Sequence, residues 1–257
     1  MRRLAISTWS LDGLLQSGTP LLDIPSQMAE RGITALDLCH FHLPTTESDY
    51  LEAFREALRA SGVELYRLLI DTGDITAPDP SQHAADIRTI EGWIDQAAAL
   101  GAGGVRISAG RQPPTPEVVE RSAGHLRAFA RRAADHGLRT HTENWQATAQ
   151  EPAALLTILD RCEDRVELCA DTGNAEATAD KYATLAQLLP RASSIHFKAR
   201  YAPDGSIVAD DLQRSFELIE GANFDGVITL IYENKQREWA GVEQLRDALQ
   251  PLLDGAA

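Results

Sequence analysis

Residues 138–144 read LRTHTEN, residues 166–174 read VELCADTGN and residues 194–198 read SIHFK. Each stretch has the pattern of a short buried strand, and each ends in or near a residue that can bind a metal ion. A fourth stretch, residues 227–234 (VITLIYEN), ends in the same way. The four residues are Glu143, Asp171, His196 and Glu233, at intervals of 28, 25 and 37 residues. This spacing is typical of strands that alternate with helices.

The same alternation extends through the rest of the chain and predicts eight strands and eight helices. The predicted strands are Leu4–Thr8, Ala35–Cys39, Glu64–Ile70, Val105–Ala109, Leu138–Glu143, Val166–Asp171, Ser194–Lys198 and Val227–Tyr232. The predicted helices are Leu21–Arg31, Ser48–Ser61, Ser81–Leu100, Thr115–His136, Pro152–Glu163, Ala179–Leu189, Asp210–Glu220 and Val242–Leu253. A glycine follows five of these helices within a residue or two, where a left-handed cap favours it. These glycines are Gly32, Gly62, Gly101, Gly137 and Gly221.

Eight strand–helix units in 257 residues predict one α/β domain over residues 1–257, a (β/α)8 TIM barrel. An open doubly wound sheet is the alternative, and it would normally carry a glycine-rich phosphate turn after its first strand. Here residues 7–13 read STWSLDG, which lacks that fingerprint. The sequence therefore favours a closed barrel and predicts no nucleotide cofactor.

In such a barrel the carboxyl ends of the strands meet at one mouth, so the four residues converge there. A carboxylate that ends a strand is often only a loop residue or a helix N-cap. Four suitable residues on successive strands favour a site, because three bare carboxylates repel one another unless a cation holds them. We expect Glu143, Asp171, His196 and Glu233 to bind one divalent metal ion. The single imidazole shifts the preference toward Mn²⁺, with Mg²⁺, Co²⁺ and Zn²⁺ as alternatives.

Composition narrows the classes of partner. A hydrophobic content of 44%, with no run of about 18 apolar residues, excludes a membrane protein. The start turns polar after three apolar positions, which is too few for a signal peptide, so we expect a cytoplasmic location. A net charge of −14 disfavours nucleic acid. Three cysteines without a CxxC pair suggest neither a disulfide framework nor a zinc ribbon.

With these motifs the chain resembles the xylose-isomerase-like barrel superfamily, which holds sugar isomerases and epimerases, inosose dehydratases and apurinic endonucleases. The resemblance covers essentially the whole chain. The ligand pattern of the superfamily, Glu, Asp, His and Glu from strands five to eight, falls on the four residues named above. Asp171-Thr172-Gly173 and His196-Phe197-Lys198 are similar to its recurring Asp-x-Gly and His-x-Lys pieces. An endonuclease would need several more histidine ligands for a trinuclear zinc cluster, whereas His83, His125 and His136 fall on predicted helices.

The resemblance implies that Glu143 and Glu233 are both metal ligands and an acid/base pair on opposite sides of a sugar. A metal that polarises a carbonyl acidifies the neighbouring C–H bond through an enediolate. Proton return then gives isomerisation or epimerisation. If a β substituent leaves instead, the same site is a lyase, like the inosose dehydratases or the relatives that release the aglycone from 3-keto-glycosides. Many epimerases of the superfamily carry a histidine three residues after the Asp, where this chain has Asn174, which cannot shuttle a proton.

Two more side chains are predicted to act in catalysis. Lys198 shares a strand face with His196 and is placed to stabilise an oxyanion. His141 shares a strand face with Glu143. It either orients Glu143 through a hydrogen bond or only fills the core layer beneath it.

Five side chains are predicted to bind substrate: His40, His42, Arg106, Trp145 and Asn174. His40 and His42 follow the second strand and are either contacts or satisfied loop residues. Arg106, within the fourth strand, either anchors a sugar oxygen or forms a structural ion pair.

The expected partner is a small-molecule sugar or sugar derivative, and the sequence leaves open whether the protein is a monomer or a homo-oligomer. A barrel that binds sugar or metal without chemistry is a third class. It is disfavoured because all four ligand types are present.

Overall fold

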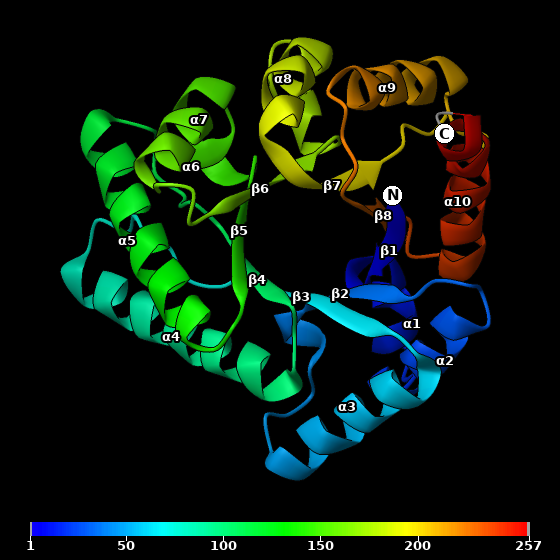
Figure 1. Ribbon diagram of the computed structural model, residues 1–257, viewed down its shortest axis with the longest axis horizontal. Helices are drawn as coiled ribbons and strands as arrows, with labels where there is room; N and C mark the ends of the chain where they lie inside the picture. The colour runs from blue at the N-terminus through cyan, green and yellow to red at the C-terminus, as the bar shows by residue number, and fades with distance from the viewer. Residues whose placement is uncertain (1, 256–257) are drawn as a thin grey trace.

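The computed structural model describes residues 2–255 as one closed barrel of eight parallel strands in the order β1 to β8. Helices surround the ring of strands (Figure 1). The strands are β1 (Arg3–Ser7), β2 (Ala35–Cys39), β3 (Glu64–Ile70), β4 (Gly104–Ile107), β5 (Arg139–Glu143), β6 (Glu167–Asp171), β7 (Ala192–Lys198) and β8 (Val227–Ile231). The predicted fold class is confirmed, and each predicted strand agrees within two residues at either end.

The described residues form ten α-helices, two more than predicted. The helices are α1 (Asp12–Gln16), α2 (Ile24–Ala29), α3 (Ser48–Ser61), α4 (Pro80–Leu100), α5 (Pro116–Asp135), α6 (Gln146–Ala149), α7 (Pro152–Arg161), α8 (Lys181–Leu188), α9 (Ala209–Gly221) and α10 (Glu238–Gly255). The short helices α1 and α6 were missed because four or five residues are too few for a periodic pattern. Five 3-10 turns complete the set: η1 (Thr8–Leu11), η2 (Leu21–Asp23), η3 (His40–His42), η4 (Asn174–Ala177) and η5 (Leu189–Arg191).

The helix ends agree with four of the five predicted glycine caps. Gly62 and Gly101 end α3 and α4 with φ of 65° and 73°, a left-handed conformation that glycine adopts without steric cost. The prediction for Gly221 was wrong. Gly221 is the last residue of α9, and Asn223 takes the positive φ of 54° instead. Asparagine tolerates this conformation because its short polar side chain can hydrogen-bond locally.

The apolar core lies between the strands and the helices, where residues such as Phe54, Phe129 and Phe197 are fully buried. The interior of the barrel is instead polar in its middle layer. Arg67 of β3 is 0% exposed and donates to both carboxylate oxygens of Asp37 on β2, at 3.0 and 2.7 Å. This buried ion pair lies directly beneath the mouth of the barrel.

None of the described helices combines the length and the apolar character that crossing a membrane requires.

Candidate metal centre at the mouth of the barrel

Strand register brings three of the predicted ligands side by side. In the ladder of β6 and β7, Asp171 pairs with His196, and in that of β5 and β6, Glu143 pairs with Cys169, which lies two residues before Asp171. Side chains two residues apart point to the same face of a strand. Glu143, Cys169, Asp171 and His196 therefore all face the barrel axis at its carboxyl end.

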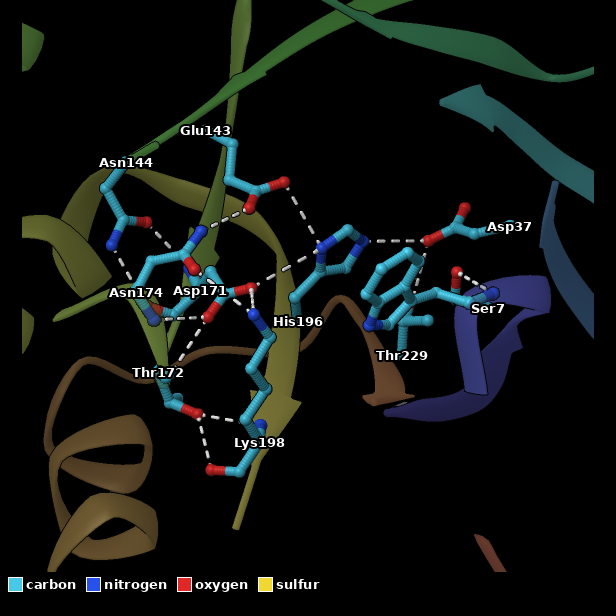
Figure 2. Close-up of polar contacts among 12 residues, drawn as sticks. Ser7, Asp37, Glu143, Asn144, Asp171, Thr172, Asn174, His196, Lys198 and Thr229 are labelled. Carbon is cyan, nitrogen blue, oxygen red and sulfur yellow. Dashed lines mark hydrogen bonds and ion pairs between the residues drawn. The ribbon is translucent and has the colours of Figure 1, made fainter. Parts of the chain in front are cut away.

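The imidazole of His196 is the centre of this group (Figure 2). Its Nδ1 lies 3.3 Å from Oε2 of Glu143 and 3.8 Å from Oδ2 of Asp171. Glu143, Asp171 and His196 are at most 4% exposed. Ligand atoms of Glu143, Cys169 and His196 also lie within 4.8 Å of one another. The structure therefore brings together three of the four predicted ligands, with Cys169 beside them.

The fourth predicted ligand, Glu233, lies two residues beyond the end of β8, and 57% of its side chain is exposed. Lys198 connects it to the others. The Nζ of Lys198 lies 3.3 Å from Oδ2 of Asp171 and 3.3 Å from Oε1 of Glu233, and it donates to Oδ1 of Asn174 at 3.1 Å. An ammonium group thus lies between two of the carboxylates predicted to bind the metal.

The donor set of the cluster is compatible with a divalent cation. Carboxylate and imidazole are ligands that Mn²⁺, Mg²⁺ and Zn²⁺ accept. Oε2 of Glu143 is buried without a hydrogen-bond donor, although Nε of Arg106 lies 3.1 Å away, so this oxygen retains coordinating capacity. The residues that could hold such an ion are Glu143, Asp171 and His196, with Glu233 in reach of the same cavity.

Glu143 is held as an anion in a fixed orientation. Its Oε1 accepts a hydrogen bond from Nδ2 of Asn174 at 2.7 Å, while Oε2 faces Arg106 and His196. Burial alone would raise the pKa of Glu143, but the charges of Arg106, His196 and Lys198 hold that pKa well below its usual range. Glu143 is therefore a carboxylate anion whose two oxygens are oriented by its neighbours.

Asp171 is fixed mainly through backbone contacts. Its Oδ1 accepts from the backbone N–H groups of Gly173 and Asn174, at 2.8 and 2.7 Å. The side-chain amide of Asn144 accepts a hydrogen bond from the backbone N–H of Asp171 and donates one to its backbone carbonyl. Burial raises the pKa of Asp171 against the opposing charge of Lys198, and the charge of Glu143 raises it further. Oδ2 remains directed at His196 and Lys198.

Sequence reasoning missed the residues that position His196. Its Nε2 lies 3.1 Å from Oδ2 of Asp37, which also accepts from Thr229 at 2.9 Å. Arg67 holds Asp37 and donates to Ser194 at 2.7 Å. A lone aspartate in the run Ala35–Cys39 and a lone arginine in β3 are weak signals, because neither reveals its partner across the barrel.

Asp71 was also missed. It follows β3, lines the cavity, and its Oδ1 forms an ion pair with Arg106. Arg106 itself is 5% exposed and lies between Asp71 and Glu143. Arg106 therefore forms structural ion pairs, which is one of the two roles expected from the sequence. It also lines the cavity, so the other role, contact with substrate, stays a prediction.

The two histidines after β2, His40 and His42, use their ring nitrogens for contacts within the protein. The ring nitrogens of His42 contact Thr8 and Asp12, both at 2.9 Å. Nδ1 of His40 accepts from the backbone N–H of Asp71 at 3.2 Å. Neither is among the described residues that line the cavity.

His141 lies one layer below Glu143 and is 0% exposed. Its Nε2 is 3.2 Å from Oε2 of Glu167, and burial lowers its pKa to about 4. Among the described residues it does not line the cavity, so a role in catalysis stays a prediction.

One cavity of about 320 Å³ is lined by eight of the polar residues described above: Asp71, Arg106, Glu143, Asp171, Asn174, His196, Lys198 and Glu233. This volume lies within the usual range for small-molecule sites. The polar end of the cavity is formed by the cluster around His196. Much of the remaining wall is apolar or aromatic, formed by Trp9, Phe41, Leu69, Trp145 and Ile231, with Ser7 and Cys39 beside them. Trp145, predicted to bind substrate, is among them, and Arg106 lies 5.4 Å from its ring centroid.

The sequence matches the family model of the xylose isomerase-like TIM barrel over residues 25–255. The chain therefore belongs to the xylose isomerase-like TIM barrel family. No curated protein sequence matches it significantly.

Three solved structures illustrate the likeness of fold. An L-ribulose 3-epimerase has a TM-score of 0.77 at 16% identity, over 100% of this chain and 96% of the other. A probable 3-DHS dehydratase from Bacillus anthracis has a TM-score of 0.74 at 15% identity, over 96% and 98%. A xylose isomerase-like TIM barrel protein from Mycobacterium smegmatis, in complex with magnesium, has a TM-score of 0.71 at 15% identity, over 99% and 98%. At these identities the likeness establishes the fold alone.

Proposed function

We propose that the protein is a divalent-metal-dependent sugar isomerase or epimerase that moves a proton next to a carbonyl group. The observation that carries the proposal is the convergence of Glu143, Asp171 and His196 at the barrel mouth, with Lys198 and Glu233 on the same cavity. Barrel enzymes place their chemistry at this end of the strands. The epimerase and the dehydratase of the same fold are consistent with the proposal.

Glu143, Asp171 and His196 would hold the metal, with Glu233 completing the set from the loop after β8. When bound, the ion draws electron density from a neighbouring carbonyl and so makes the adjacent C–H bond more acidic. We propose Mn²⁺ as the preferred ion, with Mg²⁺ next, because one imidazole accompanies three carboxylates. The likeness in fold to the magnesium complex is consistent with an ion of this class.

The two glutamates are proposed to exchange the proton from different sides of the cavity. Glu143 enters from β5 and Glu233 from the loop after β8, so a substrate between them meets both. Both oxygens of Glu143 already have neighbours in Asn174, Arg106 and His196. Glu233 is more exposed, and its ion-pair partner among the described residues is Lys198. Glu233 is therefore proposed to remove the proton, because its carboxylate is the less restrained of the two.

Lys198 is proposed to stabilise the negative charge that develops on the substrate oxygen. The side chain of Lys198 is 18% exposed, and its ammonium reaches the cavity between Asp171 and Glu233. The carboxylates raise the pKa of Lys198 against the effect of burial, so the group stays charged at neutral pH. A fixed cation at such a place lowers the barrier to forming an oxyanion.

Incubation of the purified protein with Mn²⁺ and a panel of ketoses in D₂O tests this function. We expect deuterium to enter a carbon-bound position, observed by NMR. Glu143→Gln and Glu233→Gln should each abolish exchange, whereas Glu217→Gln, on the outer helix α9, should leave it unchanged. Absence of exchange with every ketose, or full exchange by either cavity variant, contradicts the proposal.

A second candidate is a β-eliminating lyase that acts on an oxidised sugar, such as a 3-keto-glycoside or an inosose. The observation that favours it is Asn174. The side-chain amide of Asn174 donates a hydrogen bond to Glu143 and accepts one from Lys198. An amide has no group that titrates near neutral pH. Elimination needs only a base and a proton for the leaving group. Release of phenol from a phenyl 3-keto-glucoside without added redox cofactor would distinguish this reaction from epimerisation.

A further inference from the structure

The mouth of the barrel carries an unusual pair of aromatic side chains. Trp9 and Phe41 are 39% and 46% exposed, and among the described residues they are the only large hydrophobic side chains classed as exposed. Both line the cavity that contains the candidate metal ligands Glu143, Asp171 and His196. Neighbouring exposed apolar side chains are costly on a protein surface and commonly mark a binding site.

The two rings form a corner rather than a flat surface. Their centroids are 6.2 Å apart and their planes meet at 89°. A flat ligand group can therefore stack on one ring and meet the edge or face of the other, which are the favoured geometries for aromatic contacts. Trp145, Leu69 and Ile231 continue the apolar wall toward the polar end.

Phe41 is held in place by its neighbours. Phe41 lies between His40 and His42, at ring-centroid distances of 5.3 and 4.6 Å. His40 in turn packs against Trp93 at 4.9 Å, and His42 is fixed by Thr8 and Asp12. The two histidines that the sequence suggested as substrate contacts therefore support Phe41. A binding surface that is already ordered loses little entropy when it is occupied.

The arginine and lysine that line the cavity already have partners. Arg106 forms ion pairs with Asp71 and Glu143, and Lys198 with Asp171 and Glu233. No arginine or lysine among the described lining residues is therefore free to bind a phosphate group. The polar end and the apolar wall suit a ligand with oxygens at one end and an apolar group at the other.

From this arrangement we infer that the substrate is a sugar or oxidised sugar that carries a flat, aromatic substituent, and that Trp9 and Phe41 bind this substituent. The inference rests on the proposed function and specifies its substrate class. The sugar oxygens face the cluster around His196, and the aromatic group lies in the corner after β1 and β2.

The binding affinities of matched pairs of ligands test the inference without any need for catalytic turnover. Phenyl and methyl β-glycosides of glucose, galactose and xylose are titrated into the Mn²⁺-supplemented protein by calorimetry. We expect the phenyl compound of at least one pair to bind at least tenfold more tightly than its methyl partner. Trp9→Ala and Phe41→Ala should each remove most of this preference while leaving binding of the methyl compound unchanged. Trp9→Leu and Phe41→Leu, which keep apolar volume, should retain part of it.

Equal binding within all three pairs, no measurable binding of any phenyl glycoside, or an unchanged preference in both alanine variants overturns the inference. Glu217→Gln serves as the control, because Glu217 lies on the outer helix α9 and does not line the cavity. Its phenyl preference should equal that of the wild type. A phenyl preference without deuterium exchange or phenol release would refute the proposed function alone, whereas exchange without the preference would refute the aromatic site alone.

Discussion

The imidazole of His196 lies between a buried carboxylate, Asp37, and the cluster at the barrel mouth. A carboxylate only accepts hydrogen bonds, so a His196 that binds a metal ion through Nδ1 would carry its ring proton on Nε2, 3.1 Å from Oδ2 of Asp37. Nδ1 faces Glu143 and Asp171. Such a contact typically fixes the tautomer and orientation of a metal-binding histidine.

Asp37→Asn is therefore expected to weaken binding of Mn²⁺ by about 10- to 100-fold, the usual effect of losing a partner of a metal ligand. Titration calorimetry measures the affinity directly. Asp211→Asn is the matched control, because Asp211 is an equally buried carboxylate that pairs with Lys181. Thr229→Val removes one bond to Asp37 and retains its charge, so a smaller loss is expected. Unchanged affinity in a folded Asp37→Asn protein would mean that Asp37 does not position His196.

Lys198 depends on the absence of a side chain at Gly173. A Cβ there would lie 2.3 Å from Cδ and 2.8 Å from Cβ of Lys198, although the backbone at φ −78° and ψ −41° suits alanine. Gly173→Ala should therefore fold normally but displace the ammonium from Asp171 and Glu233. We expect kcat to fall by roughly tenfold or more, since loss of one group that stabilises an oxyanion typically costs about 10²- to 10³-fold.

The control for this variant is Gly124→Ala in helix α5, where an added Cβ meets nothing within 4 Å. It should retain activity and gain about 0.5–1 kcal/mol of stability from helix propensity. Urea unfolding and steady-state kinetics on both variants separate the two effects. Wild-type turnover by Gly173→Ala would rule out a catalytic role for the observed position of Lys198.

The strand pattern predicted the fold and most of the cluster because a parallel barrel brings successive strand ends together. It could not predict Asp37 with Arg67, since their contact depends on the β2–β3 register and on an irregularity between Leu36 and Asp37. Nor does sequence give the direction of a side chain in a tight turn. His40 and His42 lie in the 3-10 turn after β2, where alternation no longer applies.

The burial of His42 predicts a specific dependence of stability on pH. Burial lowers the pKa of His42 below its ordinary value of 6.5, although Asp12 partly opposes this. The unfolded chain then binds the proton more readily than the folded chain. Stability from this site is therefore present above about pH 6.5 and is lost as the pH falls below that value. His42→Gln removes the titration, so the difference in urea midpoint between wild type and variant should shrink from pH 8 to pH 5.5. An equal difference at both pH values contradicts this assignment.

The ion pair of Arg67 and Asp37 should behave as one unit in folding. Both side chains are 0% exposed, so Arg67→Met leaves the buried carboxylate of Asp37 without its guanidinium partner and should cost about 3–5 kcal/mol of unfolding free energy. Adding Asp37→Asn removes that charge, and the double variant should be more stable than the sum of the two single losses predicts. The half-exposed pair of Arg132 and Asp95 provides the comparison, because Arg132→Met should cost no more than about 1 kcal/mol. Urea unfolding of the four proteins of the cycle measures the coupling, and strictly additive losses would show that the two residues act independently.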